Sequence, residues 1–174
     1  MGRFKLNFMI YITLGTQACD FSRCMKMVED LIAKEQIKDR IVAQTGYTTY
    51  HPQGVQCFDF VSEDKYQQFM ADADIVISHA GTGALFSSIR KGKKVIAVAR
   101  LAQYGEMIND HQTEIVRKLS SEGYILDGTQ SLIEAWNKKD EFIPRPYDFE
   151  CAIPQYIDGI LFDWGLNESC RKKL

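Results

Sequence analysis

The chain has 174 residues, the length of one ordinary domain, and it is short for two full α/β domains. Its 21 basic and 23 acidic residues give a net charge of −2, which excludes a nucleic-acid-binding protein held by bulk positive charge. Apolar residues make up 45% of the chain. They never form a run of about 20, so we expect no transmembrane helix.

Short apolar runs alternate with amphipathic stretches along most of the chain. In chain order, the expected elements are a strand at 9–14, a helix at 20–34, strands at 41–44 and 57–61, a helix capped by Ser62, a strand at 75–78, a helix from Gly81 to Gly92, a strand at 95–98, a helix that ends near 121, a strand at 124–126 and a short helix at 131–138. This alternation predicts an α/β fold in which helices flank a parallel sheet.

The chain changes character beyond Pro146. Apolar side chains recur there at helical spacing: Ile153, Tyr156, Ile157, Ile160, Leu161 and Trp164. We therefore expect a domain at 1–148, followed by an amphipathic helix and tail at 149–174. This helix either packs back on its own domain or docks on a partner, and its acidic polar face argues against a membrane surface.

The strand expected at 75–78 runs into Gly81-Thr82-Gly83, which opens a helix. Two glycines leave room for a ligand, and the free N–H groups of a helix's first turn attract an anion. The segment lacks the Gly-Lys-Ser/Thr of a P-loop, and Phe86 stands where a dinucleotide fingerprint has its third small residue. These residues predict a phosphate-binding loop, with a plain tight turn as the alternative.

A second glycine turn, Gly15-Thr16-Gln17, follows the first strand. Parallel strands end at one edge of a sheet, so we expect both turns at that edge, where ligands bind. His79 ends the strand before the other turn, and a histidine in that position is more often a hydrogen-bonded structural residue than a catalyst. The convergence of two turns favours phosphate binding.

A third polar segment, residues 100–112, follows the strand at 95–98. A carboxylate such as Glu106 can grip the diol of a sugar or ribose through both oxygens. The alternative is a solvated loop in which Asn109 or Asp110 caps the next helix.

Five segments have an order and spacing that resemble a known family: YITLGTQ, AQTGYT, DADIVISHAGTGA, GKKVIAVAR and YGEMINDHQ. Over about residues 8–127 they resemble the C-terminal, nucleotide-sugar-binding domain of family 28 glycosyltransferases. Two stand-alone versions of this domain are similar: the catalytic subunit of the UDP-N-acetylglucosamine transferase of dolichol-linked glycan synthesis, and a subunit of bacterial capsule and exopolysaccharide β-1,4-galactosyltransferases. The last segment looks like the bacterial group. The resemblance implies a Rossmann-like sheet, the C-terminal half of a GT-B fold.

The resemblance also implies roles for individual residues. Gly15, Thr16 and Gln17 would border the donor diphosphate, and the main phosphate loop would contain Ser78, His79, Gly81, Thr82 and Gly83. Phe60 and Val61 match a segment that contacts the base, and Asp110, His111 and Gln112 match a motif that faces the donor sugar. Relatives of the peptidoglycan type hold the ribose with a glutamate where this chain has Ser87, and Glu106 is our candidate replacement.

We expect an inverting transfer of a hexose, with galactose favoured, from a UDP-sugar to a lipid-diphosphate-linked saccharide in capsule or exopolysaccharide synthesis. The candidate catalytic residues are His79, Glu106, Asp110 and His111. A helix N-terminus would stabilise the leaving UDP without a metal, and we expect no cofactor. The alternatives are a UDP-N-acetylglucosamine transferase catalytic subunit, a non-catalytic UDP-sugar-binding module and a flavodoxin-like protein that binds FMN.

In two-domain relatives, the acceptor surface and the general base belong largely to the other domain. We therefore expect a membrane-associated partner subunit that presents the acceptor, with this chain cytoplasmic and peripheral at the inner face of the membrane. We expect no nucleic-acid partner. The cysteines are odd in number, five, and we expect no signal peptide, which together favour reduced thiols in a cytosol. The three histidines lie far from any cysteine pair with zinc-site spacing, so we expect no structural metal.

Overall fold

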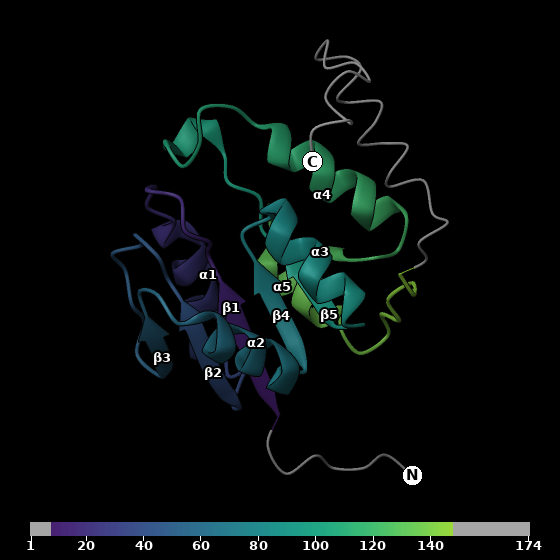
Figure 1. Cartoon of the computed structure of the whole chain (residues 1–174), viewed down its shortest axis with the longest axis horizontal. Coiled ribbons are helices and arrows are strands. Elements are labelled where there is room, and N and C mark those ends of the chain that lie inside the picture. Colours follow the sequence, from purple (N-terminus) through teal and green to yellow (C-terminus); the bar gives the residue numbers. More distant parts are fainter. Residues whose placement is uncertain (1–7, 148–174) are drawn as a thin grey trace.

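Residues 8–147, which the computed structural model describes, form a six-stranded parallel sheet flanked by helices (Figure 1). The strands are β1 (Met9–Thr13), β2 (Arg40–Gln44), β3 (Val55–Phe58), β4 (Ile75–Ser78), β5 (Lys94–Ala97) and β6 (Leu126–Asp127), in the order β3-β2-β1-β4-β5-β6. The helices are α1 (Ser22–Ala33), α2 (Glu63–Asp72), α3 (Thr82–Arg90), α4 (His111–Ser121) and α5 (Leu132–Asn137), with a 3-10 turn, η1, at Ala102–Tyr104. This Rossmann-like arrangement confirms the expected fold class.

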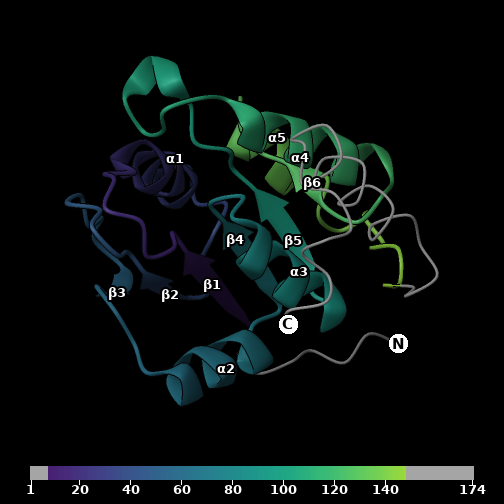
Figure 2. The same cartoon turned by 45° about the horizontal axis from the view of Figure 1, so that its top comes forward.

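The sheet is buried on both faces because its strands present apolar side chains to both sides. In β1, Met9 and Tyr11 face a core that also contains residues of α2, α3 and α4. Ile10 and Ile12 face a second core, shared with α1 and α5. Figure 2 shows α1 and α2 on opposite sides of β1. The result is three layers, with β1 buried along its whole length.

Two of the helices begin at side-chain caps, whereas α3 does not. The Ser62 hydroxyl accepts a hydrogen bond from the Lys65 amide, which confirms the expected cap of α2. The Ser131 hydroxyl caps α5 in the same way, through the Glu134 amide. The N-cap of α3 is Gly81, which forms no side-chain cap. The first N–H groups of α3 therefore keep their capacity to bind another partner.

Strand β3 lies earlier in the chain than the sequence indicated. The expected strand was 57–61, whereas β3 spans Val55–Phe58. Its register decides the difference, because Phe58 pairs with Gln44, the last residue of β2. The two candidate base-contact residues therefore lie beyond the strand, in the connection to α2.

The order of the strands reverses at β1 and β4, the two adjacent central strands. From β1 the sheet continues outward through β2 and β3, and from β4 it continues in the opposite direction through β5 and β6. Loops that leave such a pair diverge and open a crevice at the carboxyl edge of the sheet. Thr13 and Ser78 pair in register, so the turns after β1 and β4 begin at the same level.

Within residues 8–147, no helix combines the length and apolar character that crossing a bilayer requires. The amphipathic helix and tail expected at 149–174 lie outside the described residues. The division of the chain near residue 148 therefore stays a prediction.

Candidate functional site

A cavity of about 430 Å³ opens at the carboxyl edge of the sheet, beside the ends of β1 and β4. Its walls come from the turn after β1, the end of β2, the start of α2 and the opening of α3. Candidates from the sequence among the lining residues are Gly15, Thr16, Val61, His79, Gly81, Thr82 and Gly83. The two glycine turns thus meet at one cavity, as their positions after parallel strands predicted.

The imidazole of His79 lies between the two glycine turns. Its Nδ1 is 3.0 Å from the Thr13 carbonyl oxygen, which can only accept a hydrogen bond, so Nδ1 carries the proton. A Cβ atom on Gly15 would lie 2.5 Å from His79 Nε2, and one on Gly81 would lie 2.2 Å from it. Both positions therefore need glycine. Because Nδ1 carries the proton, Nε2 of the neutral ring keeps its lone pair and can accept a hydrogen bond.

The environment of His79 lowers its pKa to about 4. Burial is the largest cause, since it disfavours the charged ring, and the positive charge of Arg100 acts in the same direction. The hydrogen bond to the Thr13 carbonyl opposes both. His79 is therefore neutral at pH 7, and an anion that binds against it would raise its pKa.

We expect this histidine to make the protein less stable as the pH falls. His79 stays neutral in the folded protein down to about pH 4, whereas in the unfolded chain it gains a proton near pH 6.5. The unfolded state binds more protons between these values, so the free energy of unfolding should fall by about 3 kcal/mol across them. Above about pH 6.5 His79 is neutral in both the folded and the unfolded state, so it adds no pH dependence to the free energy of unfolding. Urea unfolding of the wild type and His79→Gln over this pH range tests it, and equal slopes would contradict it.

The opening of α3 presents main-chain donors to the cavity. Thr82, Gly83 and Ala84 form its first turn and line the cavity, and the Thr82 hydroxyl adds a donor. N–H groups at a helix N-terminus bind phosphate through hydrogen bonds and the helix dipole. Ser78, expected in the same loop, is fully buried, and its hydroxyl has no hydrogen-bond partner among the described residues.

Hydrogen bonds join the connection between β1 and α1 to the loop after β2. The Asp20 carboxylate accepts hydrogen bonds from the Thr49 amide and hydroxyl and from the amide and hydroxyl of Ser22. The Phe21 amide donates to the Thr48 hydroxyl. Burial acts to raise the pKa of Asp20, but these hydrogen bonds outweigh it and lower the pKa. Earlier in this connection, Gly15 and Thr16 line the cavity, whereas Gln17 is not part of the lining.

The other end of the cavity is formed by the connection from β3 and by α2. Val61 lines it, as expected of a base-contact residue, whereas Phe60 does not. The Phe60 ring is half exposed and packs edge-on against Tyr47, with ring centroids 5.5 Å apart. Phe60 is thus positioned beside the cavity rather than in its wall.

The lining residues that were not among the candidate site residues are Thr13, Gln44, Glu63, Tyr66 and Ala84. Thr13 and Gln44 end β1 and β2, so their place at strand ends was an available signal. Glu63 and Tyr66 lie on α2, and no local pattern shows how that helix crosses the sheet. Burial raises the pKa of Tyr66, and a hydrogen bond with Ser87 opposes the rise.

Glu106 is engaged away from the cavity. Its two carboxylate oxygens accept hydrogen bonds from Arg23 at 2.9 and 3.0 Å, and Oε2 also accepts from the Leu101 amide at 2.9 Å. Arg23 further donates to the carbonyl oxygens of Thr129 and Ala99. Glu106 is 3% exposed and does not line the cavity. The geometry therefore favours a structural role for Glu106 over the ribose contact expected from the sequence.

The segment Asp110-His111-Gln112 also lies outside the cavity lining. Asp110 Oδ1 accepts from the Ala102 amide at 2.7 Å, and the buried Gln112 side chain accepts from the Arg100 amide at 3.0 Å. His111 is exposed at the start of α4, where its Nδ1 contacts Asn109 Oδ1. Asp110 and Gln112 thus shape the loop before α4. A contact of these residues with a donor sugar stays a prediction.

Residues 9–148 match the model of the glycosyltransferase family 28 C-terminal domain. The chain belongs to this family. Within residues 8–147 of this family 28 domain, no three His, Cys, Asp or Glu side chains are grouped so that they could hold a metal ion. The expected absence of a cofactor stays a prediction.

Curated relatives of this family 28 domain are named UDP-N-acetylglucosamine transferase subunit ALG13. The Candida glabrata protein is 30% identical over 135 residues, which cover 74% of this chain and 65% of the relative. The human protein is 28% identical over 123 residues, which cover 67% of this chain and 10% of the relative. The chain thus spans somewhat less than two thirds of the first of these proteins and a tenth of the second.

Solved structures share the fold of the family 28 domain. An NMR structure of ALG13 aligns with a TM-score of 0.57 at 19% identity, over 89% of this chain and 95% of that one. The crystal structure of Acinetobacter baumannii MurG aligns with a TM-score of 0.53 at 16% identity, over 94% of this chain and 54% of that one. These similarities show a GT-B half-fold, in agreement with the expected fold.

Proposed function

We propose that this chain is the donor-binding subunit of a UDP-N-acetylglucosamine transferase. The observation that carries the proposal is the uncapped start of α3, which faces the cavity beside His79 in a family 28 domain. Its N–H groups suit a diphosphate, and the connection from β3 leaves room for the base at the other end of the cavity. Relatives named as UDP-N-acetylglucosamine transferase subunits support the sugar.

The proposed chemistry is an inverting displacement without a metal. Negative charge develops on UDP as the glycosidic bond breaks, and the N–H groups of α3 with the Thr82 hydroxyl would stabilise that charge. An acceptor hydroxyl attacks the opposite face of the sugar and needs a general base. His79 is a poor base at neutral pH, because its lowered pKa makes its conjugate acid too strong. We therefore assign the base to a partner chain.

The galactose and capsule expectation has no support among the curated relatives reported above. N-acetylglucosamine, one of the alternatives drawn from the sequence, replaces it as the proposed sugar. A lipid-diphosphate-linked saccharide is the proposed acceptor, and a membrane-associated partner subunit would present it at the cytoplasmic face.

Titration calorimetry with UDP tests donor binding. We expect saturable binding of UDP that a chelator such as EDTA leaves unchanged. Replacement of Thr82 by valine removes the hydroxyl and should weaken binding by about 10- to 100-fold, which corresponds to one hydrogen bond to a charged group. No UDP binding by the wild type would overturn the proposal, and binding that requires a divalent metal would overturn its metal-free form.

Transfer of labelled sugar to lipid tests the reaction. The chain should transfer N-acetylglucosamine from its UDP-sugar only when membranes from its own source are added, and UDP-galactose should serve poorly. Full activity of the purified chain alone would contradict the need for a partner. Exclusive use of UDP-galactose would restore the galactose interpretation.

A further inference from the structure

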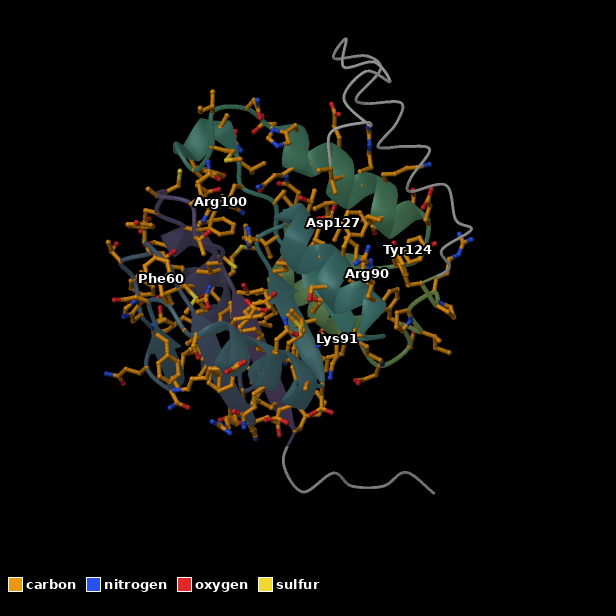
Figure 3. All side chains as sticks on the ribbon, in the orientation of Figure 1. Phe60, Arg90, Lys91, Arg100, Tyr124 and Asp127 are labelled. Carbon is orange, nitrogen blue, oxygen red and sulfur yellow. The ribbon has the colours of Figure 1, made fainter. Side chains whose placement is uncertain are left out.

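Arg100 is a buried cation directly behind the turn that follows β1. It comes after β5, is 1% exposed, and lies between α1 and η1 (Figure 3). Its Nη2 donates to the Leu14 carbonyl oxygen at 2.8 Å, and its guanidinium lies 5.3 Å from the centre of the Phe21 ring. The Leu14 carbonyl precedes Gly15, so Arg100 holds the start of the turn that lines the cavity.

The guanidinium of Arg100 leaves two of its three nitrogen atoms without a hydrogen-bond acceptor among the described residues. Its Nε and Nη1 are buried and have no hydrogen-bond partner among residues 8–147. The nearby Glu106 carboxylate is bound to Arg23 instead, and Asp20 is exposed and bound to Thr49 and Ser22. Burial lowers the pKa of Arg100, but a guanidinium stays protonated in proteins. A buried positive charge without a direct ion pair costs free energy, which a functional need would explain.

The charge of Arg100 reaches the cavity although its side chain does not line it. Arg100 lowers the pKa of His79, whose ring forms part of the cavity wall. A field that disfavours a positive charge on His79 favours a negative charge placed against that ring. Arg100 is 1% exposed and contacts the turn directly, and charges buried in this way are screened much less by salt than exposed ones.

We infer that Arg100 is a positioning residue for the donor diphosphate: it fixes the turn after β1 and stabilises negative charge in the cavity from behind that turn. This inference rests on the proposed binding of UDP. Among the described residues, no lysine or arginine lines the cavity. Under this inference the positive charge near the diphosphate comes instead from Arg100, which does not contact the ligand.

Two substitutions separate the charge of Arg100 from its hydrogen bond. Arg100→Gln keeps a donor for the Leu14 carbonyl but removes the charge, and Arg100→Lys keeps the charge. Arg40→Gln is the matched control, because Arg40 is exposed at the start of β2, at the opposite edge of the sheet. Each protein is titrated with UDP and with uridine, which lacks the diphosphate, and thermal unfolding confirms that each is folded.

We expect Arg100→Gln to reduce the preference for UDP over uridine by about tenfold, with uridine affinity almost unchanged. Arg100→Lys and Arg40→Gln should keep the wild-type preference within about threefold. Equal weakening of UDP and uridine in Arg100→Gln would show a merely structural role and overturn the inference. If Arg100→Gln does not fold, a loss of preference in the folded Arg100→Lys would overturn the charge effect, and a retained preference would support it. Failure of the wild type to bind UDP would instead overturn the proposed function.

Discussion

Replacement of Glu106 by alanine is expected to lower the free energy of unfolding by about 3–5 kcal/mol. Its side chain is 4% exposed and accepts three hydrogen bonds, two from Arg23 and one from the Leu101 amide. The substitution leaves a half-buried guanidinium without its counter-charge. It also releases the loop between β5 and α4, which Glu106 ties to α1 across 83 positions of sequence.

The control for this prediction is Glu122→Ala. Glu122 directly follows α4 and pairs at 2.8 Å with Lys118, whose side chain is about half exposed, so its loss should cost less than about 1 kcal/mol. Chemical unfolding of both variants and the wild type gives the comparison. If Glu106→Ala kept wild-type stability but lost UDP binding, Glu106 would be a ligand contact, as the sequence alone suggested.

Replacement of Gly81 by alanine is expected to weaken UDP binding by roughly 1,000-fold, about 4 kcal/mol. A Cβ at this position would lie 2.2 Å from His79 Nε2, far inside the contact distance. The ring is held by the Thr13 carbonyl, and Gly15 also approaches it closely. The ring or the start of α3 must therefore shift, and the N–H groups that face the cavity lose their alignment.

Gly83→Ala is the comparison for Gly81→Ala, since it adds the same methyl group two residues further along the chain. A Cβ on Gly83 would meet no protein atom within 4 Å. We expect its effect on UDP affinity to be less than about tenfold, because no protein group has to move. Calorimetry with UDP measures both variants, and circular dichroism confirms that both are folded. Equal losses would show that space for the ligand, not the position of His79, makes Gly81 necessary.

Much of the fold could be predicted from the sequence because its causes are local. Apolar runs of four to five residues became strands, and Ser62 caps α2 as its position before two acidic residues indicated. The glycine turns could also be predicted, because turns after parallel strands share one edge of the sheet. The end of β3 could not be predicted, because apolar residues continue beyond Phe58 in the sequence. The strand ends at Phe58 because that residue pairs with Gln44, the last residue of β2.

The roles of the polar residues were less predictable. A carboxylate in a polar loop has the same local signature whether it binds a diol or a buried guanidinium. Only the position of Arg23, on a helix far away in sequence, decides that Glu106 does the second. Tyr66 and Glu63 reached the cavity for a similar reason, because the path of α2 over the sheet depends on packing against the strands.

By itself, the sequence determined an α/β sheet and two glycine turns at its carboxyl edge, because hydrophobic period and glycine conformation act over a few residues. The motifs in their order also determined the family. Only the tertiary structure decided which side chains face the cavity, that His79 among them is neutral, and that Arg100 is buried behind the turn after β1. Burial and charge pairing decide those properties, and both depend on neighbours that the chain brings together from distant positions.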